Sequence, residues 1–409
     1  MRIVVIHHAR TFDSTKEYLS DDFKNANEKL FGAQEMDTWA GVRLLSVNHI
    51  VWRIEICPNI RKARFITPDG EVIKQISVDF PQGLNKLKKF FYIKSLIKYL
   101  DTSIAYFADK SLKNEISAFI LHHQIDLAWW DTQFYDALIP EGVKSIVRSV
   151  NFEPKHVLSE DPSLFRWVRF AGKLWSERRI SRNRFLVSIS PSDRKNYKRI
   201  GAKQIHEIPL RQLPFVLESK FEVVENRTNL VFFGSSFDVR HNRRNLESLA
   251  CDIAPLIAKT SPGVQIASFG HRIPRGFSLP ENMHHFGFVP NLQGIQIGSL
   301  GVIVPFNGGA GMQSKIFEPL CLGVPLIANP RNFADYNFIP GVHYLAATNP
   351  TEYVLAVKFL RENHNEIEKM QQKTRSATLA LFNRRVYLNH LDNLISKVFE
   401  DTNSFLSSP

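Results

Sequence analysis

The residues with the clearest capacity for chemistry lie in "NGGAGMQSKIFEPLCLGVPLIANP", residues 307–330. Bare glycine backbone is followed there by one cation, Lys315, and one carboxylate, Glu318, near the start of a helical pattern. Glycine lets a phosphate approach backbone N–H groups, because a Cβ atom would hold it away. The first N–H groups of a helix and its positive dipole end favour an anion, and Lys315 adds a point charge. Since Glu318 shares a helix face with Lys315, we expect a ligand that carries hydroxyls as well as phosphates.

The segments on either side of this motif indicate where in the fold its glycines lie. "LGVIVPF" (300–306) and "VPLIAN" (324–329) are expected to be strands, which places the glycines between the carboxyl end of a strand and the N-terminus of a helix. Pro319 removes one helical N–H, so the helix is expected to be kinked or to begin late. The alternative is that the glycines only turn the chain and that Lys315 and Glu318 form a surface pair.

The elements that must position the motif alternate along the whole chain. Short, continuous apolar runs are typical of strands that are covered on both faces of a parallel sheet. The expected strands are 2–8, 125–131, 144–152, 184–190, 229–235, 264–270, 300–306 and 324–329. The expected helices are 81–100, 111–123, 163–181, 242–260, 312–322 and 350–380, with a last helical segment after Phe382. This alternation predicts an α/β fold with a doubly wound parallel sheet in each half, and the carboxyl ends of such sheets bind ligands. The proline-containing stretch 205–220 is the predicted linker.

Composition limits the class of protein. The chain has 409 residues, of which 44% are hydrophobic and 22% charged, so a globular protein of two domains is expected. The three cysteines are far apart and fit neither a disulfide framework nor a zinc site. No apolar run approaches the roughly 20 residues of a membrane-spanning helix, which indicates a cytoplasmic protein. A net charge of +12 points to an anionic partner: nucleic acid, a membrane surface or a phosphorylated small molecule.

Several segments resemble GT-B glycosyltransferases, in particular the large retaining family called group 1. The donor-site signature of that family is similar to "VPFNGGAGMQSKIFEPLCLGVPLIAN" (304–329), and "HHFGFVPNLQGIQIGSLGVIVP" (284–305) precedes it as in the family. "NLVFFGSSFDVRHNRRNLESL" (229–249) resembles the opening of the family's second domain. "VRSVNFEP" (147–154) and "SERRISRNRFLVSISPSDRKNY" (176–197) resemble first-domain segments of some bacterial members, and the first is similar to their R-x-H-N-x-E segment. The resemblance covers most of 144–390 in order.

The resemblance implies the GT-B fold, with two doubly wound, Rossmann-like parallel-sheet domains facing a cleft. An acceptor-side domain would span 1–210 and a donor domain 215–385. A C-terminal helix over 386–409 would pack back on the first domain. The implied enzyme is a hexosyltransferase that moves a sugar from a nucleoside diphosphate sugar to a hydroxyl of a glycan or glycolipid, as in the synthesis of surface polysaccharides.

The resemblance also assigns the donor-binding residues. Glu318 would accept hydrogen bonds from the ribose of the nucleotide, and Lys315 with Arg240 or Arg243 would neutralise the diphosphate leaving group. Phe288 would lie near the base. The backbone that meets the phosphates or the sugar would be supplied by Gly311, Met312, Gln313 and Ser314, with Gly234 in the turn after the first strand of the second domain. Such preorganised cations and N–H groups can stabilise a departing diphosphate without an essential metal.

The sequence departs from the family at two positions. Many members have a glutamate eight positions before Glu318, where this chain has Ala310. The histidine of R-x-H-N-x-E is replaced by Val150, although Arg148, Asn151 and Glu153 remain.

Three first-domain residues are the catalytic candidates. Glu153 and Asn151 follow an expected strand and could face the cleft, where Glu153 could act as general base for an acceptor hydroxyl. The alternative for both is a polar loop residue that caps the next element. His8 ends the first strand and could bind the acceptor or transfer a proton. Adjacent histidines on a strand face opposite ways, so the pair His7-His8 is a poor chelate and no metal site is expected.

The segment 81–100 carries five lysines among aromatic and aliphatic residues and could contact a membrane surface that holds a lipid-linked acceptor. A basic surface helix without such contact is the alternative, and the same two interpretations apply to residues 165–185. Nucleic-acid binding would use the same cations, but no nucleic-acid module is recognisable, and we expect no nucleic-acid partner. A GT-B-shaped protein that binds a nucleotide-sugar without transferring it is the remaining alternative.

Overall fold

The structure is a computed structural model and describes residues 1–12, 17–29, 32–80, 86–305, 311–333 and 335–406. The chain divides into two compact units, each with its own sheet. Unit 1 contains residues 1–21, 34–211 and 387–409, and unit 2 contains residues 22–33 and 212–386.

The sheet of unit 1 has eight strands in the order β4-β3-β2-β1-β5-β6-β7-β8. Its strands are β1 (Arg2–His8), β2 (Ile50–Cys57), β3 (Lys62–Ile66), β4 (Val72–Ser77), β5 (Leu127–Trp130), β6 (Ser145–Ser149), β7 (Phe185–Ser188) and β8 (Ile205–Glu207). The four apolar residues at 3–6 in β1 are fully buried, which fits a central strand with both faces covered. All neighbours from β2 across β1 to β8 pair in parallel.

The other edge of this sheet differs from the prediction of a parallel sheet. β2 pairs with β3, and β3 with β4, in antiparallel register. Short connections allow this arrangement, because antiparallel strands can be joined by a tight turn whereas parallel strands need a crossover. The turn after β3 contains Gly70, whose φ of 87° lies in the left-handed region that glycine adopts readily. The sequence analysis missed these strands because charged residues interrupt β2 and β3, and β4 is exposed along most of its length, so none of them is a continuous apolar run.

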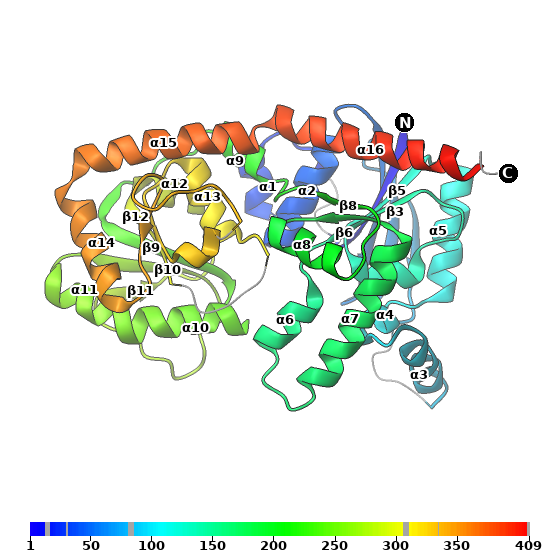
Figure 1. Ribbon diagram of the computed structural model, residues 1–409, viewed down its shortest axis with the longest axis horizontal. Coiled ribbons are helices and arrows are strands. Elements are labelled where there is room, and N and C mark those ends of the chain that lie inside the picture. Colours follow the sequence, from blue (N-terminus) through cyan, green and yellow to red (C-terminus); the bar gives the residue numbers. More distant parts are fainter. Residues whose placement is uncertain (13–16, 30–31, 81–85, 306–310, 334, 407–409) are drawn as a thin grey trace. The chain divides into compact units, whose positions relative to one another are not determined.

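Helices cover both faces of the unit 1 sheet (Figure 1). The helices of unit 1 are α2 (Ala33–Leu45), α3 (Lys86–Tyr99), α4 (Thr102–Tyr106), α5 (Lys110–His122), α6 (Glu153–Glu160), α7 (Arg166–Asn183), α8 (Pro191–Arg199) and α16 (Arg384–Leu406), with 3₁₀ turns at Glu17–Leu19 and Gln133–Leu138. In Figure 1 α6 and α7 lie side by side and extend away from the sheet as a helical hairpin.

The sheet of unit 2 has six strands, all parallel, in the order β11-β10-β9-β12-β13-β14. The strands are β9 (Asn226–Ser236), β10 (Gln265–His271), β11 (Met283–His285), β12 (Ser299–Val304), β13 (Leu326–Ala328) and β14 (Leu345–Ala346). The helices are α1 (Phe23–Lys29), α9 (Leu213–Glu218), α10 (Arg240–Ser248), α11 (Ala254–Thr260), α12 (Leu292–Gly298), α13 (Ser314–Leu322), α14 (Pro350–Glu362) and α15 (His364–Phe382), with a π-helical turn at Leu249–Ile253 and a 3₁₀ turn at Pro330–Phe333. This doubly wound arrangement confirms the predicted α/β class.

Two segments belong to a unit whose other residues are distant in sequence: 387–409 to unit 1 and 22–33 to unit 2. Tyr387 of α16 donates from its hydroxyl to the carbonyl oxygen of Leu210 at 2.9 Å, within unit 1. The segment 22–33 belongs to unit 2, where the rings of Phe23 and Phe221 lie 6.1 Å apart. The predicted first domain, 1–210, contained this segment, because nothing in its composition separates it from its neighbours. Within the described part of the chain, no helix is both long and apolar enough to cross a bilayer.

Candidate functional site

The N-terminus of α13 lies where the motif predicts it, after the carboxyl end of β12. Gly308, Gly309 and Ala310 fall outside the described residues. Gly311 has a φ of 72°, in the left-handed region, and Met312 is buried. Gln313 is the N-cap, yet its side chain makes no capping hydrogen bond. The side chain of Gln313 therefore leaves the start of α13 open, and the N-terminus of a helix is a position that suits an anion.

Lys315 is buried in the first turn of α13, with 6% of its surface exposed. Its Nζ donates to Oδ1 of Asn242 at 3.3 Å, and Nδ2 of Asn242 donates to the carbonyl oxygen of Ser236 at 3.0 Å. A Cβ atom on Gly234 would lie 3.3 Å from the Asn242 side chain, so the glycine leaves room for this amide. The structure thus brings Lys315 and Gly234 together through Asn242, a residue that the sequence analysis did not single out.

Glu318 lies one turn further along α13 and is also buried, with 7% of its surface exposed. Nε2 of Gln212 donates to its Oε1 at 2.5 Å, and Gln293 supplies a second side-chain hydrogen bond. Burial raises the pKa of Glu318 to about 7, although both hydrogen bonds act to lower it. A carboxylate held by neutral amides keeps a high affinity for any further donor, such as a ligand hydroxyl.

Both glutamines are themselves held in place. Gln212 precedes α9, and its carbonyl accepts from the N–H groups of Phe215 and Val216. Arg375 of α15 donates to the carbonyl of Leu217 at 3.0 Å and to that of Cys321 at 2.6 Å, which ties the end of α9 to the end of α13. Asn27 of α1 donates to Oε1 of Gln293 at 2.7 Å. No sequence motif marks these partners, because each lies far from Glu318 along the chain.

The other predicted donor-side residues are less enclosed. Arg240 is the first residue of α10 and is partly exposed. Arg243 donates from Nε to the carbonyl of Phe237 at 3.2 Å, and 43% of its side chain is exposed. Phe288 stacks on His271 with ring centroids 5.6 Å apart. An exposed, stacked aromatic pair of this kind suits a flat ligand group such as a base.

In unit 1 the predicted catalytic residues occupy different surroundings. Glu153 begins α6 and is buried, with Nζ of Lys173 at 3.8 Å from its carboxylate. Burial raises the pKa of Glu153, against the charge of Lys173. The backbone carbonyl of Asn151 accepts hydrogen bonds from Gln133 and Ser149. His8 ends β1, and burial, followed by the charge of Arg10, lowers its pKa.

Glu177 is an acidic residue beside Glu153 that the sequence analysis missed. It is almost fully buried in α7 and accepts from the hydroxyl of Tyr197 at 2.8 Å. Burial raises its pKa to about 8, although the bond from Tyr197 acts in the other direction. Since Glu153 adds to that rise, the two carboxyl groups influence each other's ionisation.

Arg148, the arginine of the R-x-H-N-x-E resemblance, lies in a buried charge network. Its Nη2 lies 2.8 Å from Oδ2 of Asp37. Arg211 binds the same Asp37 through its guanidinium and its backbone N–H, and it also reaches Asp131 at 2.6 Å. Val150, at the position of the family's histidine, donates its N–H to Oε1 of Gln133 at 3.4 Å.

The described residues contain no cluster of side chains that would form a metal site. No group of three or more His, Cys, Asp or Glu side chains there gathers as a set of ligands. His7 and His8 both lie on β1, and burial lowers the pKa of His7 to about 4. The expectation that no essential metal is needed stays a prediction.

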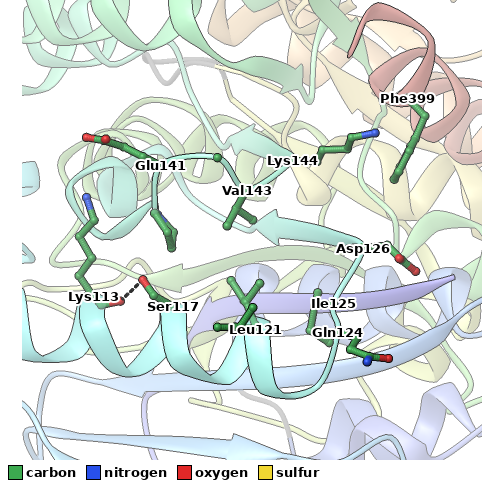
Figure 2. A pocket seen from close by; sticks show the side chains of 13 residues that line it. Lys113, Ser117, Leu121, Gln124, Ile125, Asp126, Glu141, Val143, Lys144 and Phe399 are labelled. Carbon is green, nitrogen blue, oxygen red and sulfur yellow. Dashed lines mark hydrogen bonds between the residues drawn. The ribbon is translucent and has the colours of Figure 1, made fainter. Parts of the chain in front are cut away.

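Unit 1 contains a groove of about 890 Å³ at the amino ends of β5 and β6. Figure 2 shows it between α5 and the residues that lead into β6, with Lys144 beside Phe399 of α16. The Nζ of Lys144 lies 3.8 Å from the ring centroid of Phe399. Asp126 and Lys144 precede β5 and β6, so this groove is at the amino ends of the strands. Open α/β sheets bind substrates at the carboxyl ends, and the groove is not the candidate site.

Comparison with known proteins gives the family context. Residues 253–386, about a third of the chain, match a family model described as glycosyl transferase-like. Among solved structures, sucrose-phosphate synthase from Thermosynechococcus elongatus is similar with a TM-score of 0.65 and 14% identity, over 98% of this chain and 99% of that chain. The UDP-glucose complex of Anabaena Alr3699/HepE gives a TM-score of 0.53 and 13% identity, over 97% of this chain and 100% of that chain. TarM from S. aureus gives 0.53 and 12%, over 82% of this chain and 64% of that chain. No curated protein matches the sequence.

These comparisons confirm three predictions from the sequence. The fold is GT-B, as the similar structures show. The family match falls on the unit that holds Lys315 and Glu318. The predicted resemblance to group 1 transferases and the predicted enzyme class agree with both findings, the glycosyl transferase-like match over residues 253–386 and the GT-B fold.

Proposed function

We propose that this GT-B glycosyltransferase moves a sugar from a nucleoside diphosphate sugar to a hydroxyl of a glycan or glycolipid, in the synthesis of a surface polysaccharide. One observation carries the proposal. A buried lysine and a buried carboxylate lie one turn apart at the N-terminal end of α13, each hydrogen-bonded to a side-chain amide. Phosphates and hydroxyls are the groups that such a site binds.

On the donor side, Lys315 and the first N–H groups of α13 would bind the diphosphate. As the sugar–phosphate bond breaks, charge develops on the departing diphosphate, and these groups stabilise it without moving. Arg240 and Arg243 would add charge from α10, and Phe288 would pack against the base. Glu318 would accept hydrogen bonds from the ribose. A metal is not required in this scheme.

On the acceptor side, Glu153 would remove the proton from the attacking hydroxyl. A general base works best when its pKa lies near the working pH, and burial moves the pKa of Glu153 in that direction. Asn151 and His8 would orient the acceptor. Replacement of Glu153 by Gln should lower kcat by about 10²-fold or more with little change in donor affinity.

The UDP and UDP-glucose complexes of the Anabaena protein support a test with nucleotides. We expect one of UDP, GDP, ADP, CMP and dTDP to stabilise the protein in thermal-shift and calorimetric titrations. Lys315→Ala and Glu318→Ala should each weaken that nucleotide by at least about tenfold, because a charged hydrogen bond contributes roughly 1.5–3 kcal/mol. Lys358→Ala, an exposed lysine of α14, is the matched control.

Three outcomes would change the proposal. Normal nucleotide affinity in both variants would remove the site assignment. Nucleotide binding without sugar release to any acceptor would favour a nucleotide-sugar binder that lacks transfer activity. No response to any nucleotide, together with salt-sensitive binding to a random oligonucleotide, would favour the nucleic-acid alternative.

The proposed location is the cytoplasm, with peripheral contact at the inner face of the membrane through residues 81–100. The support comes from α3, where Ile93, Lys94, Ile97 and Lys98 are all exposed. The side chains of Lys86, Lys88 and Lys89 lie outside the described residues. A lipid-linked acceptor would be reached most easily by an enzyme held at that surface.

A further inference from the structure

Helix α7 buries mainly polar residues and exposes several large apolar ones, unlike an ordinary surface helix. Its buried residues are Lys173, Ser176, Glu177, Ile180 and Ser181, four of them polar. A helix on a soluble domain normally buries its apolar stripe and exposes its polar face. The buried face of α7 is satisfied by polar partners, because Lys173 and Ser176 both bind the carboxylate of Asp101 at 3.0 and 2.8 Å.

The exposed face carries several apolar residues instead. Val168, Ala171 and Trp175 follow one another on α7 at spacings of three and four residues, and Leu164, in the turn just before the helix, lies four residues before Val168, so the four residues form one stripe. The exposed fractions of the three large side chains are 95% for Leu164, 71% for Val168 and 58% for Trp175. Phe165 and Trp167 lie beside the start of this stripe and are 72% and 58% exposed. Contiguous exposed apolar side chains of this size mark an interaction surface.

The stripe begins at the outer end of the α6–α7 hairpin (Figure 1). α3 reaches the same helix, because a Cβ atom on Gly172 would lie only 2.2 Å from the carbonyl oxygen of Leu100. Glycine at 172 therefore lets the end of α3 pack directly on α7. The stripe, the two aromatic residues beside it and the exposed residues of α3 together form an exposed apolar and basic surface.

The charges around this surface indicate its partner. The sequence of α3, "KLKKFFYIKSLIKY", has five lysines and no acidic residue. Arg166 and Arg178 are exposed at either end of the stripe. Asp161, the acidic residue next to its start, forms an ion pair with Arg169 at 3.0 Å. Exposed Trp, Phe, Leu and Val among Lys and Arg suit the boundary between lipid headgroups and acyl chains.

We propose that the stripe of α7, together with α3, docks the enzyme on an anionic lipid surface, with the side chains of Leu164, Val168 and Trp175 inserted below the headgroups. This rests on the proposed membrane contact through residues 81–100 and extends it to α7, where residues 165–185 carry the same alternatives in the sequence. Its test is independent of nucleotide binding, because the stripe belongs to unit 1 and the donor residues to unit 2.

Vesicle co-sedimentation tests the proposal directly. The wild type should bind vesicles of phosphatidylcholine with phosphatidylglycerol and bind pure phosphatidylcholine weakly. Leu164→Ser/Val168→Ser/Trp175→Ser should weaken binding to the anionic vesicles by at least tenfold. The matched control is Ile339→Ser/Leu355→Ser/Leu379→Ser, three exposed apolar residues of unit 2, and it should bind as the wild type does. Unchanged melting temperature and nucleotide affinity would show that both variants are folded.

Tryptophan fluorescence supplies a second readout. Four of the six tryptophans are buried or partly buried, whereas Trp167 and Trp175 are exposed. Brominated lipids should therefore quench fluorescence in the wild type and quench much less in Trp167→Phe/Trp175→Phe. Absence of wild-type binding to anionic vesicles, or equal binding by the stripe variant, would overturn the proposal. A dimer in sedimentation velocity that the stripe substitutions dissociate would also overturn it and identify a second copy as the partner.

Discussion

Two carboxyl groups, one in each unit, are both buried, but their pKa values shift in opposite directions. Asp131 in unit 1 is 1% exposed and Glu318 in unit 2 is 7% exposed. Burial acts to raise the pKa of both groups. For Asp131 the charges of Arg211 and Arg148 outweigh burial and lower the pKa. For Glu318 the neutral amides of Gln212 and Gln293 do not outweigh it, and the pKa rises to about 7.

The difference separates a structural charge from a charge that is suited to a ligand. The unit 1 network pairs Asp37 and Asp131 with Arg148 and Arg211, so opposite charges neutralise each other inside the fold. Glu318 is bonded instead to groups that carry no charge, and a ligand donor can still gain from it. Perturbed, incompletely neutralised groups of this kind concentrate at functional sites.

The largest expected effect comes from breaking the charge network. Asp37→Ala should lower the free energy of unfolding by about 3–5 kcal/mol, because it leaves two buried guanidinium groups without their shared partner. Urea denaturation measures this. The control is Asp238→Ala, whose carboxylate is half exposed and pairs with Arg272; it should cost about 1 kcal/mol or less. Equal effects in the two variants would contradict the structural role of the network.

Glu318→Gln should remove a pH-dependent loss of stability that the wild type shows between about pH 4.5 and 7. The folded protein holds the proton of Glu318 up to a pH of about 7, whereas the unfolded chain loses it near 4.5. Stability therefore falls as pH rises between these values, with a slope that approaches about 1.4 kcal/mol per pH unit. The variant should lack this fall while losing nucleotide affinity. Unfolding curves measured from pH 4 to 8 in both proteins test this, and parallel pH profiles would rule out the assigned pKa.

Gln212→Ala should change the pH dependence of nucleotide binding. If the ionised form of Glu318 accepts the ribose hydroxyls, affinity falls as pH drops through the pKa of Glu318. Loss of the Gln212 donor should raise that midpoint by about 0.5–1 pH unit, as expected for one hydrogen bond. Gln372→Ala, which replaces an exposed glutamine of α15, is the control. A lower affinity with an unchanged midpoint would indicate a packing role for Gln212 alone.

Gly234→Ala should have the smallest effect. Its new Cβ atom would lie 3.3 Å from the side chain of Asn242, which must then move by a few tenths of an ångström. Because Asn242 holds Lys315, nucleotide affinity should fall about two- to fivefold, or by roughly 0.5–1 kcal/mol. Isothermal titration calorimetry resolves such a change. A loss as large as that of Lys315→Ala would mean that Gly234 itself contacts the ligand.

The sequence predicted the parts of this protein that depend on local patterns. Continuous apolar runs identified β1 and the strands around the motif, since a strand covered on both faces needs no polar alternation. The turn after β12, the start of α13 and the positions of Lys315 and Glu318 followed from neighbours within about two turns of chain. The antiparallel strands β3 and β4 were missed because charged residues interrupt β3 and because β4 is exposed along most of its length.

What only the tertiary structure decided is which charges are neutralised and which surfaces stay exposed. Arg211 and Asp37 are 174 residues apart in sequence, and Gln212 and Glu318 are 106 residues apart. Arg148 and Lys315 therefore looked alike as motif cations, although one binds a carboxylate and the other an amide. Likewise, the apolar stripe of α7 has the period of an ordinary core helix, and only the packing of Lys173 and Ser176 onto Asp101 turns it outward. Long-range partners set the pKa of a group and the face that a helix buries, and local sequence does not contain them.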